Sequence, residues 1–512
     1  MEHILTYFIF FPVFMAFLLG AVPPQKTRWI YRIALLSTIF HMLWLFLLVS
    51  TPEIRAGQWF WVESMPWIDS LYITYSLGMD GLSALMCLLT SVVFVSAVMM
   101  SHKIQKRQKA YFILLMLLLT GIYGVFLSMD FFLFYIFWEL ALIPLYFLIG
   151  IWGGQRREYA AIKFFIYTMV GSVFLLLGLI LVYYFNPLEL PLDWANLPMH
   201  QTWILASVYS IWDIPLPVIL FFCFFIAFAI KVPIFPFHTW LPDAHVQAPT
   251  PISMILAGIL LKIGMYGLFR VMVGFVPVVV LNVAPTLFIL GLINLIYGAF
   301  CAMYQKDFKK LIAYSSISHM GFCIIGLASF SALSLQGSVM QMVSHGLIAA
   351  MLFLIAGSIY ERTYSLTLSD LGGLAATMPK LTWMGVFAVF ASIGLPGLFG
   401  FVSEFLVLAG SFMGHTSPHA YVGSVYFFQI GSAIALVTLL IGAVYMLWTL
   451  QRVFFGPAEQ KWALVQDINN KEFLVCSVLA ILIVWFGVFP SVLLEMPQTS
   501  ILQWLDWIGV GS

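Results

Sequence analysis

The sequence predicts an all-α integral membrane protein of about fourteen transmembrane helices, and three observations lead to that prediction. First, 63% of the 512 residues are hydrophobic and only 8% are charged, whereas soluble domains carry about 25% charged residues. Second, the apolar residues fall into runs long enough to cross a bilayer. Third, lysine and arginine are concentrated in every second connection between these runs. The same composition argues against nucleic-acid binding, disorder and a secreted disulfide scaffold.

The apolar runs match the thickness of a bilayer, whose core of about 30 Å requires about 20 residues per helix. The first run has no lysine or arginine at its amino end and no small-residue cleavage site, so we expect a retained helix rather than a signal peptide. The expected spans lie near residues 4–22, 29–49, 81–100, 111–128, 131–152, 160–185, 216–236, 251–275, 284–304, 310–330, 335–360, 382–412, 427–450 and 472–492.

The positive charges give an independent test of these spans. Of the 22 lysines and arginines, seventeen fall in loops on one side, two (Arg55 and Arg270) in loops on the other, and three within spans. Because cytoplasmic loops are enriched in these residues, we expect both termini on the outer side of a cell inner membrane. The long connections near 50–80 and 186–215 are rich in tryptophan, proline and acidic residues, and we expect them to form ordered caps.

Two of the expected spans contain residues that interrupt a helix. Pro233 and Pro236 follow Lys231 in the seventh span, and a glycine- and proline-rich stretch from Gly394 to Gly400 precedes Glu404 in the twelfth. The breaks lie five helices apart, and an odd offset inverts topology, so helices four to eight and nine to thirteen are expected to be inverted repeats. The chain is therefore expected to divide into the amino-terminal helices (residues 1–110), the first half-repeat (111–275), the second half-repeat (276–455) and the carboxyl-terminal helix with its tail (456–512).

Six ionisable side chains lie inside the middle spans, one on each of six helices, where each costs several kcal/mol unless it is paired or functional. We expect Glu139 and Lys231 to form a pair in which burial favours the neutral form of each group once the pair opens. Three further residues extend a proton relay, because histidine and desolvated lysine change protonation state readily. The candidate proton-handling residues are Glu139, Lys231, Lys262, His319, His345 and Glu404.

Structural interpretations of the same residues remain open at this point. A buried ion pair can serve only to fix helix register, and a lone histidine in a helix often serves only in packing, as we expect for His41. His238, Asp243 and His245 follow the first break, but no third ligand accompanies them, so we expect no metal site. The five cysteines lie in apolar surroundings without paired spacing, so we expect neither a redox centre nor a metal cluster on this chain.

Four motifs resemble those of the antiporter-like subunits of respiratory complex I, the NADH:quinone oxidoreductase, and the resemblance covers nearly the whole chain. The motifs are FFLFYIFWELALIPLYFLIGIWGG, FHTWLPDAHVQAPTPISMILAGILLKIGMYGLFR, DFKKLIAYSSISHMGF and ASIGLPGLFGFVSEF. The resemblance implies fourteen helices with two inverted five-helix repeats and broken helices seven and twelve. It also implies that Glu139 and Lys231 form the coupling pair, that Lys262 is the central lysine, that His319 and His345 are relay groups, and that Glu404 is the terminal group.

Within this family, glutamate at position 404 and the absence of a long lateral helix match the subunit M branch, which is similar to mitochondrial subunit four and to the corresponding chloroplast protein. The expected function is therefore proton translocation coupled to quinone reduction. The resemblance implies that NADH, flavin, iron–sulfur clusters and quinone bind to partner subunits, with no cofactor on this chain. The expected partners are L-like, N-like and small membrane-arm subunits. The alternatives are a multisubunit cation/proton antiporter, a membrane-bound hydrogenase or formate-linked complex, and a non-transporting scaffold.

Overall fold

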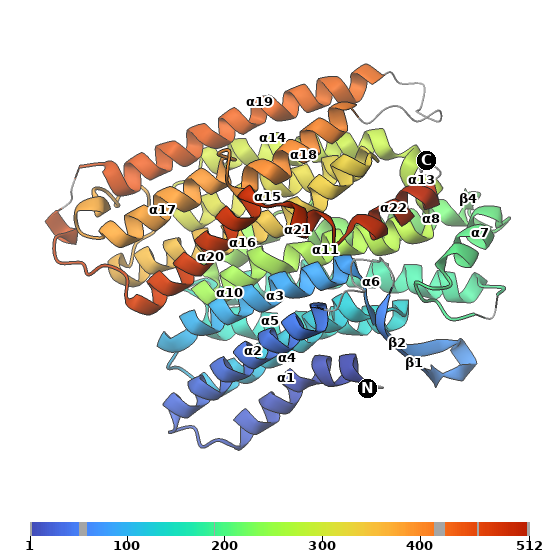
Figure 1. Cartoon of the computed structure of the whole chain (residues 1–512), viewed down its shortest axis with the longest axis horizontal. Helices are drawn as coiled ribbons and strands as arrows, with labels where there is room; N and C mark the ends of the chain where they lie inside the picture. The colour runs from blue at the N-terminus through green and yellow to red at the C-terminus, as the bar shows by residue number, and fades with distance from the viewer. Residues whose placement is uncertain (1–2, 51–58, 189, 414–424, 458–459, 509–512) are drawn as a thin grey trace.

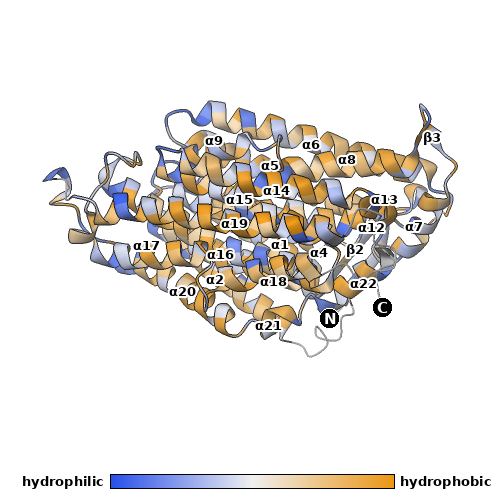
Figure 2. Ribbon diagram, turned by 90° about the horizontal axis from the view of Figure 1, so that it is seen from above, coloured by the Kyte–Doolittle hydropathy of each residue, from blue (hydrophilic) through white to orange (hydrophobic). Residues whose placement is uncertain are grey.

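The computed structural model describes residues 3–50, 59–188, 190–413, 425–457 and 460–508. Long helices lie side by side along one axis, and both termini lie at the same end (Figure 1). Hydrophobic residues cover most of the length of these helices, and hydrophilic residues gather toward the two ends (Figure 2). The loop joining the first two helices lies at the end opposite the termini, as the charge distribution predicts for an inside loop.

Twelve helical segments in the described part of the chain are long and apolar enough to span a membrane. Two shorter apolar helices, Leu216–Lys231 and Phe399–Met413, belong to the two spans that the sequence predicts to be broken. The all-α membrane fold is therefore confirmed, while the inverted repeat stays a prediction. The first six spans are α1 (Ile4–Ala21), α2 (Thr27–Val49), α3 (Gly81–Met100), α4 (Gln108–Leu127), α5 (Phe131–Trp152) and α6 (Arg157–Phe185).

The seventh span consists of α8 (Leu216–Lys231), an irregular turn and α9 (Trp240–Gln247). The eighth span runs over Thr250–Phe275 and contains α10 (Thr250–Ile255), α11 (Leu261–Gly267) and α12 (Val273–Phe275). Two π-helical turns, Leu256–Leu260 and Leu268–Met272, separate these three pieces. The central Lys262 is therefore framed by wide turns on both sides, a feature that is frequent at functional sites.

The second half of the chain repeats the pattern of long helices with one break. Its helices are α13 (Pro277–Asn282), α14 (Ala284–Met303), α15 (Phe308–Ala328), α16 (Ala332–Thr363), α17 (Pro379–Ser392), α18 (Phe399–Met413), α19 (Val425–Leu450), α20 (Asn470–Val488), α21 (Ser491–Leu494) and α22 (Gln498–Ile508). Between α17 and α18 the backbone turns at Gly394 and Gly397, whose φ angles of +74° and +92° favour glycine. This stretch replaces the middle of the twelfth helix.

The connections expected as caps are ordered over their described residues. The first contains a hairpin of β1 (Phe60–Ile68) and β2 (Ile73–Met79), and the second contains α7 (Leu197–Ala206) with the short strands β3 (Ser210–Ile211) and β4 (Ile214–Pro215). The Glu63 side chain ties the hairpin to α1, because it accepts hydrogen bonds from the Leu5 amide at 2.5 Å and the Thr6 hydroxyl at 2.6 Å. Arg55 lies outside the described residues.

A network of charges joins three helices at the opposite end. Glu472, at the start of α20, is fully buried and accepts hydrogen bonds from Arg362 of α16 at 2.6 Å and from Lys103, just after α3, at 3.0 Å. Lys103 also pairs with Glu361. Asn469 and Glu472 complete the network with a capping box at the amino end of α20. These contacts fix the last long helix against the first half of the chain.

Candidate functional site

Four of the six predicted proton-handling residues form a row that begins in the eighth span and continues through the second half of the chain. The Lys262 ammonium lies 2.7 Å from His345 Nδ1, the rings of His345 and His319 lie 5.6 Å apart between centroids, and His319 Nδ1 lies 3.1 Å from Glu404 Oε1. These residues come from the eighth span, α16, α15 and α18. The row is therefore built from four separate helices, each of which contributes one titratable group.

Polar side chains that the sequence interpretation did not single out support His319. Gln341 Nε2 lies 3.4 Å from His319 Nδ1, Ser392 Oγ lies 3.3 Å from His319 Nε2, and the Ser403 hydroxyl donates to Gln341 Oε1 at 2.5 Å. A small cavity of about 10 Å³ lies between His319, His345 and Glu404, which is close to the space that one water molecule needs. Both ring nitrogens of His319 therefore have partners for the exchange of a proton.

The break between α17 and α18 positions Glu404. A side chain at Gly394 would place its Cβ 2.8 Å from Glu404 Oε2, so the bare glycine leaves room for the carboxylate. The carboxylate is buried, and its ion pair with His319 is internal to the protein. The unwound stretch thus lies directly beside the terminal group, which agrees with the rule that irregular backbone at membrane depth lines polar sites.

Glu139 and Lys231 are not joined directly in this structure. Lys231 is 2% exposed, and its ammonium lies 4.9 Å from the centroid of the Trp138 ring. No ion pair within 4.0 Å connects it to Glu139 among the described residues, and Glu139 Oε1 is buried without a hydrogen-bond partner there. The pairing of Glu139 with Lys231 therefore stays a prediction, and Trp138 provides a cation–π surface for the lysine.

The backbone brings Lys231 close to the helix that carries Lys262. The Cβ of Lys231 would lie 3.1 Å from a Cβ added at Gly264, which is two residues beyond Lys262. The bare glycine at position 264 therefore allows α8 to pack closely against the eighth span. The connection of Glu139 and Lys231 with the row stays a prediction.

Lys231→Arg is expected to lose proton pumping nearly as fully as Lys231→Ala, because arginine keeps the positive charge but effectively never releases its proton. Lys380→Arg, at an exposed lysine, is the matched control. Proton uptake by inverted membrane vesicles would be measured during quinone reduction, with assembly checked on a native gel. Full pumping by the Lys231→Arg protein would show that Lys231 acts only as a fixed charge.

Two basic residues lie elsewhere than the charge analysis placed them. Arg270, expected in an outer loop, lies in the eighth span and is 2% exposed. Lys309, expected in an inside loop, lies in the first turn of α15, where its buried ammonium donates to the Ala248 carbonyl at 3.0 Å. Lys262, Tyr266 and Arg270 follow one another at four-residue intervals, and residues with this spacing share one helix face. This spacing indicates that Arg270 belongs to the helix that carries Lys262.

The remaining expectations concern metals, cysteines and His41. Among the described residues, no group of three or more His, Cys, Asp or Glu side chains is arranged to hold a metal ion. Four cysteines are buried and Cys301 is partly buried, all with free thiols. His41 Nε2 donates to the Phe8 carbonyl at 2.9 Å and the ring packs among aromatic rings, which agrees with a packing role.

Comparison with known proteins agrees with this architecture. Residues 128–428 match the family described as NADH:quinone oxidoreductase/Mrp antiporter, TM. The chain is 38% identical to NADH-quinone oxidoreductase subunit M of Rickettsia conorii, over 93% of this chain and 92% of that protein. It is also 38% identical to the chloroplastic NAD(P)H-quinone oxidoreductase chain 4 of Mesostigma viride, over 88% of this chain and 87% of that one.

Two solved structures share the fold. A chain of respiratory complex I from Thermus thermophilus with bound NADH superposes with a TM-score of 0.84 at 26% identity, covering 99% of this chain and 100% of that chain. A chain of the Mrp complex from a Dietzia species superposes with a TM-score of 0.83 at 20% identity over 99% of each chain, a likeness of fold alone. On the family match and the full-length relatives together, this chain belongs to the NADH:quinone oxidoreductase/Mrp antiporter family of membrane subunits.

Proposed function

We propose that this chain is a proton-translocating membrane-arm subunit of an NADH:quinone oxidoreductase. The main support for the proposal is the row of titratable groups Lys262, His345, His319 and Glu404. Neighbouring members of this row lie close to one another inside the bundle of membrane-spanning helices. Such a row is costly in lipid and has no evident use in a static scaffold. The subunit M and chain 4 relatives, which match over most of their length, support the coupling to quinone reduction.

In this proposal the row passes protons in steps between neighbouring groups. A proton on His345 or His319 reaches the next group through a hydrogen bond or through one water in the small cavity beside Glu404. Moving one charge against 100 mV costs about 2.3 kcal/mol, so the energy must arrive from elsewhere in the complex. NADH, flavin, iron–sulfur clusters and quinone are assigned to partner subunits, and this chain carries none of them.

The position of Glu139 supports contact with a neighbouring subunit. Glu139 is only partly buried, and Ile143 and Phe147, which follow it at four-residue intervals on α5, are 50% and 42% exposed. A carboxylate beside a lipid-facing surface costs several kcal/mol when it has no partner, so we assign this face of α5 to the contact with another membrane-arm subunit. The proposed location is a cell inner membrane, with both termini on its outer side.

Glu139→Ala is expected to reduce coupled electron transfer and proton pumping severely while leaving the complex assembled, because the charge that faces Lys231 and the neighbouring subunit is lost. Glu139→Asp should retain much of the activity, since only one methylene is removed. Glu158→Ala, at an exposed glutamate on α6, is the matched control. NADH-driven quinone reduction and dye-detected proton uptake would be measured in the same vesicles. Normal values of both in Glu139→Ala would contradict the proposed function.

Membership of a cation/proton antiporter is the alternative, and it rests on the fold shared with the Mrp complex. It predicts sodium-dependent proton movement without quinone chemistry, so the same vesicles distinguish it. If proton uptake depended on an imposed sodium gradient and did not change on addition of NADH, the antiporter assignment would replace the one proposed here.

A further inference from the structure

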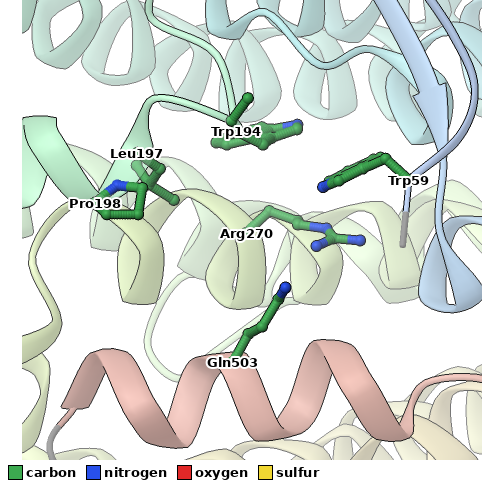
Figure 3. Close-up of a pocket in the computed structure, with 7 residues that line it drawn as sticks. Trp59, Trp194, Leu197, Pro198, Arg270 and Gln503 are labelled. Carbon is green, nitrogen blue, oxygen red and sulfur yellow. The ribbon is translucent and has the colours of Figure 1, made fainter. Parts of the chain in front are cut away.

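A cavity of about 210 Å³ lies at the end of the molecule that bears both termini. Four segments that are far apart in the sequence line it, and Figure 3 shows their side chains around one arginine. Trp59 precedes the β1 strand, Trp194 belongs to the second cap, Arg270 belongs to the eighth span and Gln503 belongs to α22. The cavity has room for several water molecules, and a buried cation lies at its inner wall.

Arg270 is paired across the molecule with Asp80, the residue that caps the amino end of α3. The two members of the pair are held unequally. Asp80 also accepts hydrogen bonds from the Ser83 amide at 2.9 Å and the Ser500 hydroxyl at 2.5 Å. Arg270 Nε, in contrast, is buried without a hydrogen-bond partner among the described residues. The carboxylate is therefore held by several hydrogen bonds, while the guanidinium packs against the Tyr266 ring at 5.5 Å and keeps one N–H without a partner in the described part of the chain.

The cavity provides space into which the guanidinium can move. The guanidinium carbon lies 4.9 Å from the centroid of the ring of Trp59, which lines the cavity, so this indole can stabilise the cation on the cavity side. Figure 3 shows the Arg270 side chain directed between Trp59 and Gln503. Withdrawal of the guanidinium from Asp80 would leave the carboxylate facing a polar, hydrated space.

Polar groups continue from the ion pair toward the centre of the membrane. The Tyr266 hydroxyl lies 3.1 Å from Ser83 Oγ and donates to the Phe126 carbonyl at 3.1 Å. Tyr266 is one helical turn from Lys262, and Arg270 is one turn beyond it, so the three share one face over about 12 Å at ~1.5 Å per residue. The π-helical turns on both sides of α11 allow this short segment to change its winding while keeping backbone hydrogen bonds.

We propose that this region is a gated proton outlet, in which the Arg270–Asp80 pair is the closed gate and the cavity is the outer vestibule. The inference rests on the proposed function, because it gives Lys262 a route to the outer side through the first half of the chain. In the closed state, the fixed positive charge of Arg270 repels protons and prevents their return. Displacement of Arg270 toward Trp59 connects Tyr266 and Asp80 with the vestibule.

The experiment uses a charged, membrane-impermeant thiol reagent applied to intact cells that carry Gln503→Cys in the full complex. Gln503 is exposed and lines the cavity, so the cysteine should react from outside. Inverted vesicles prepared afterwards should show loss of NADH-driven proton pumping, compared with untreated cells of the same strain. Gln498→Cys, an exposed glutamine of the same helix that does not line the cavity, is the matched control and should keep its pumping. The treated native protein controls for the five existing thiols.

Any other result of this experiment would contradict the proposed proton outlet. Failure of the reagent to modify Gln503→Cys would show that the cavity is closed to the outer side. Full pumping after modification would show that protons do not leave there, and equal inhibition of Gln498→Cys would show an unspecific effect. A second variant, Asp80→Asn, removes the charge that holds Arg270 and should lower the protons pumped per electron in an assembled complex. An unchanged ratio would assign the ion pair a structural role.

The failure of the outlet is distinguishable from the failure of the proposed function. If Glu139→Ala and Lys262→Ala lose pumping while modified Gln503→Cys retains it, the chain pumps protons and they leave elsewhere. If Glu139→Ala and Lys262→Ala both pump normally, the proposed function itself is wrong, whatever the cysteine variants show.

Discussion

Replacing Lys262 with alanine should lower proton pumping by about tenfold or more, because a gap in the row exposes a migrating proton to an apolar interior that costs several kcal/mol per charge. The Lys262 ammonium donates to the Ala257 carbonyl at 2.5 Å and contacts His345 Nδ1 at 2.7 Å. Alanine removes both contacts and the only titratable group on its helix turn. Quinone reduction should fall with pumping, since the two are coupled in the proposed function.

The matched variants separate loss of a proton carrier from loss of packing. Lys262→Arg keeps the charge and much of the bulk, and it should fail because the guanidinium does not release a proton. Lys306→Ala, at an exposed lysine between α14 and α15, should be silent. Pumping would be followed by dye quenching in inverted vesicles, beside the amount of assembled complex on a native gel. An active Lys262→Arg complex would make Lys262 a fixed electrostatic element.

Glu404→Gln should impair pumping by about tenfold while leaving the chain folded and inserted, because the amide keeps size and hydrogen bonding but cannot carry a proton between His319 and the far side. Glu404→Lys should also lose activity. It would replace the carboxylate beside His319 with a cation, which can no longer accept a hydrogen bond or a proton from the imidazole.

The control for Glu404 is Glu495→Gln, which removes an exposed carboxylate near the carboxyl end of the chain. Proton uptake would be compared at equal amounts of assembled complex in reconstituted vesicles. Unimpaired pumping in Glu404→Gln would assign the Glu404–His319 ion pair to structure, and the terminal proton group would then lie elsewhere on α18 or α19.

The spans and their breaks were predictable from the sequence because both depend on local chemistry. A run of about 20 apolar residues has few alternatives to a membrane helix, and Pro233, Pro236 and the glycines from Gly394 onward disrupt helix geometry wherever they occur. The interruption of the seventh and twelfth spans therefore follows from the residues themselves. The π-helical turns around Lys262 were not predictable, since they depend on how the eighth span packs against its neighbours.

The candidate site was predictable in membership and less so in contacts. An ionisable residue inside an apolar run is conspicuous because burying its charge in lipid is costly. The sequence therefore indicates Lys262, His345, His319 and Glu404 as site residues without any knowledge of their distances. Partnerships between distant segments carry no local signal. Asp80 and Arg270 are 190 residues apart, and nothing in either segment specifies the other. The separation of Glu139 from Lys231 likewise follows from the placement of α5, which no motif specifies.

The buried charge network at the start of α20 bears on how the chain is made. Glu472 is synthesised more than 100 residues after Arg362 and 369 residues after Lys103. Until the ribosome has delivered α20, Arg362 lacks the buried carboxylate with which it pairs in the final fold, and Lys103 has only Glu361 of its two carboxylate partners in the described part of the chain. Arrival of Glu472 closes the bundle between α3 and α16. Maturation of this protein in the membrane is therefore completed by its last long helix, and quality control that monitors unpaired charge in the bilayer would act on chains that stop short of it.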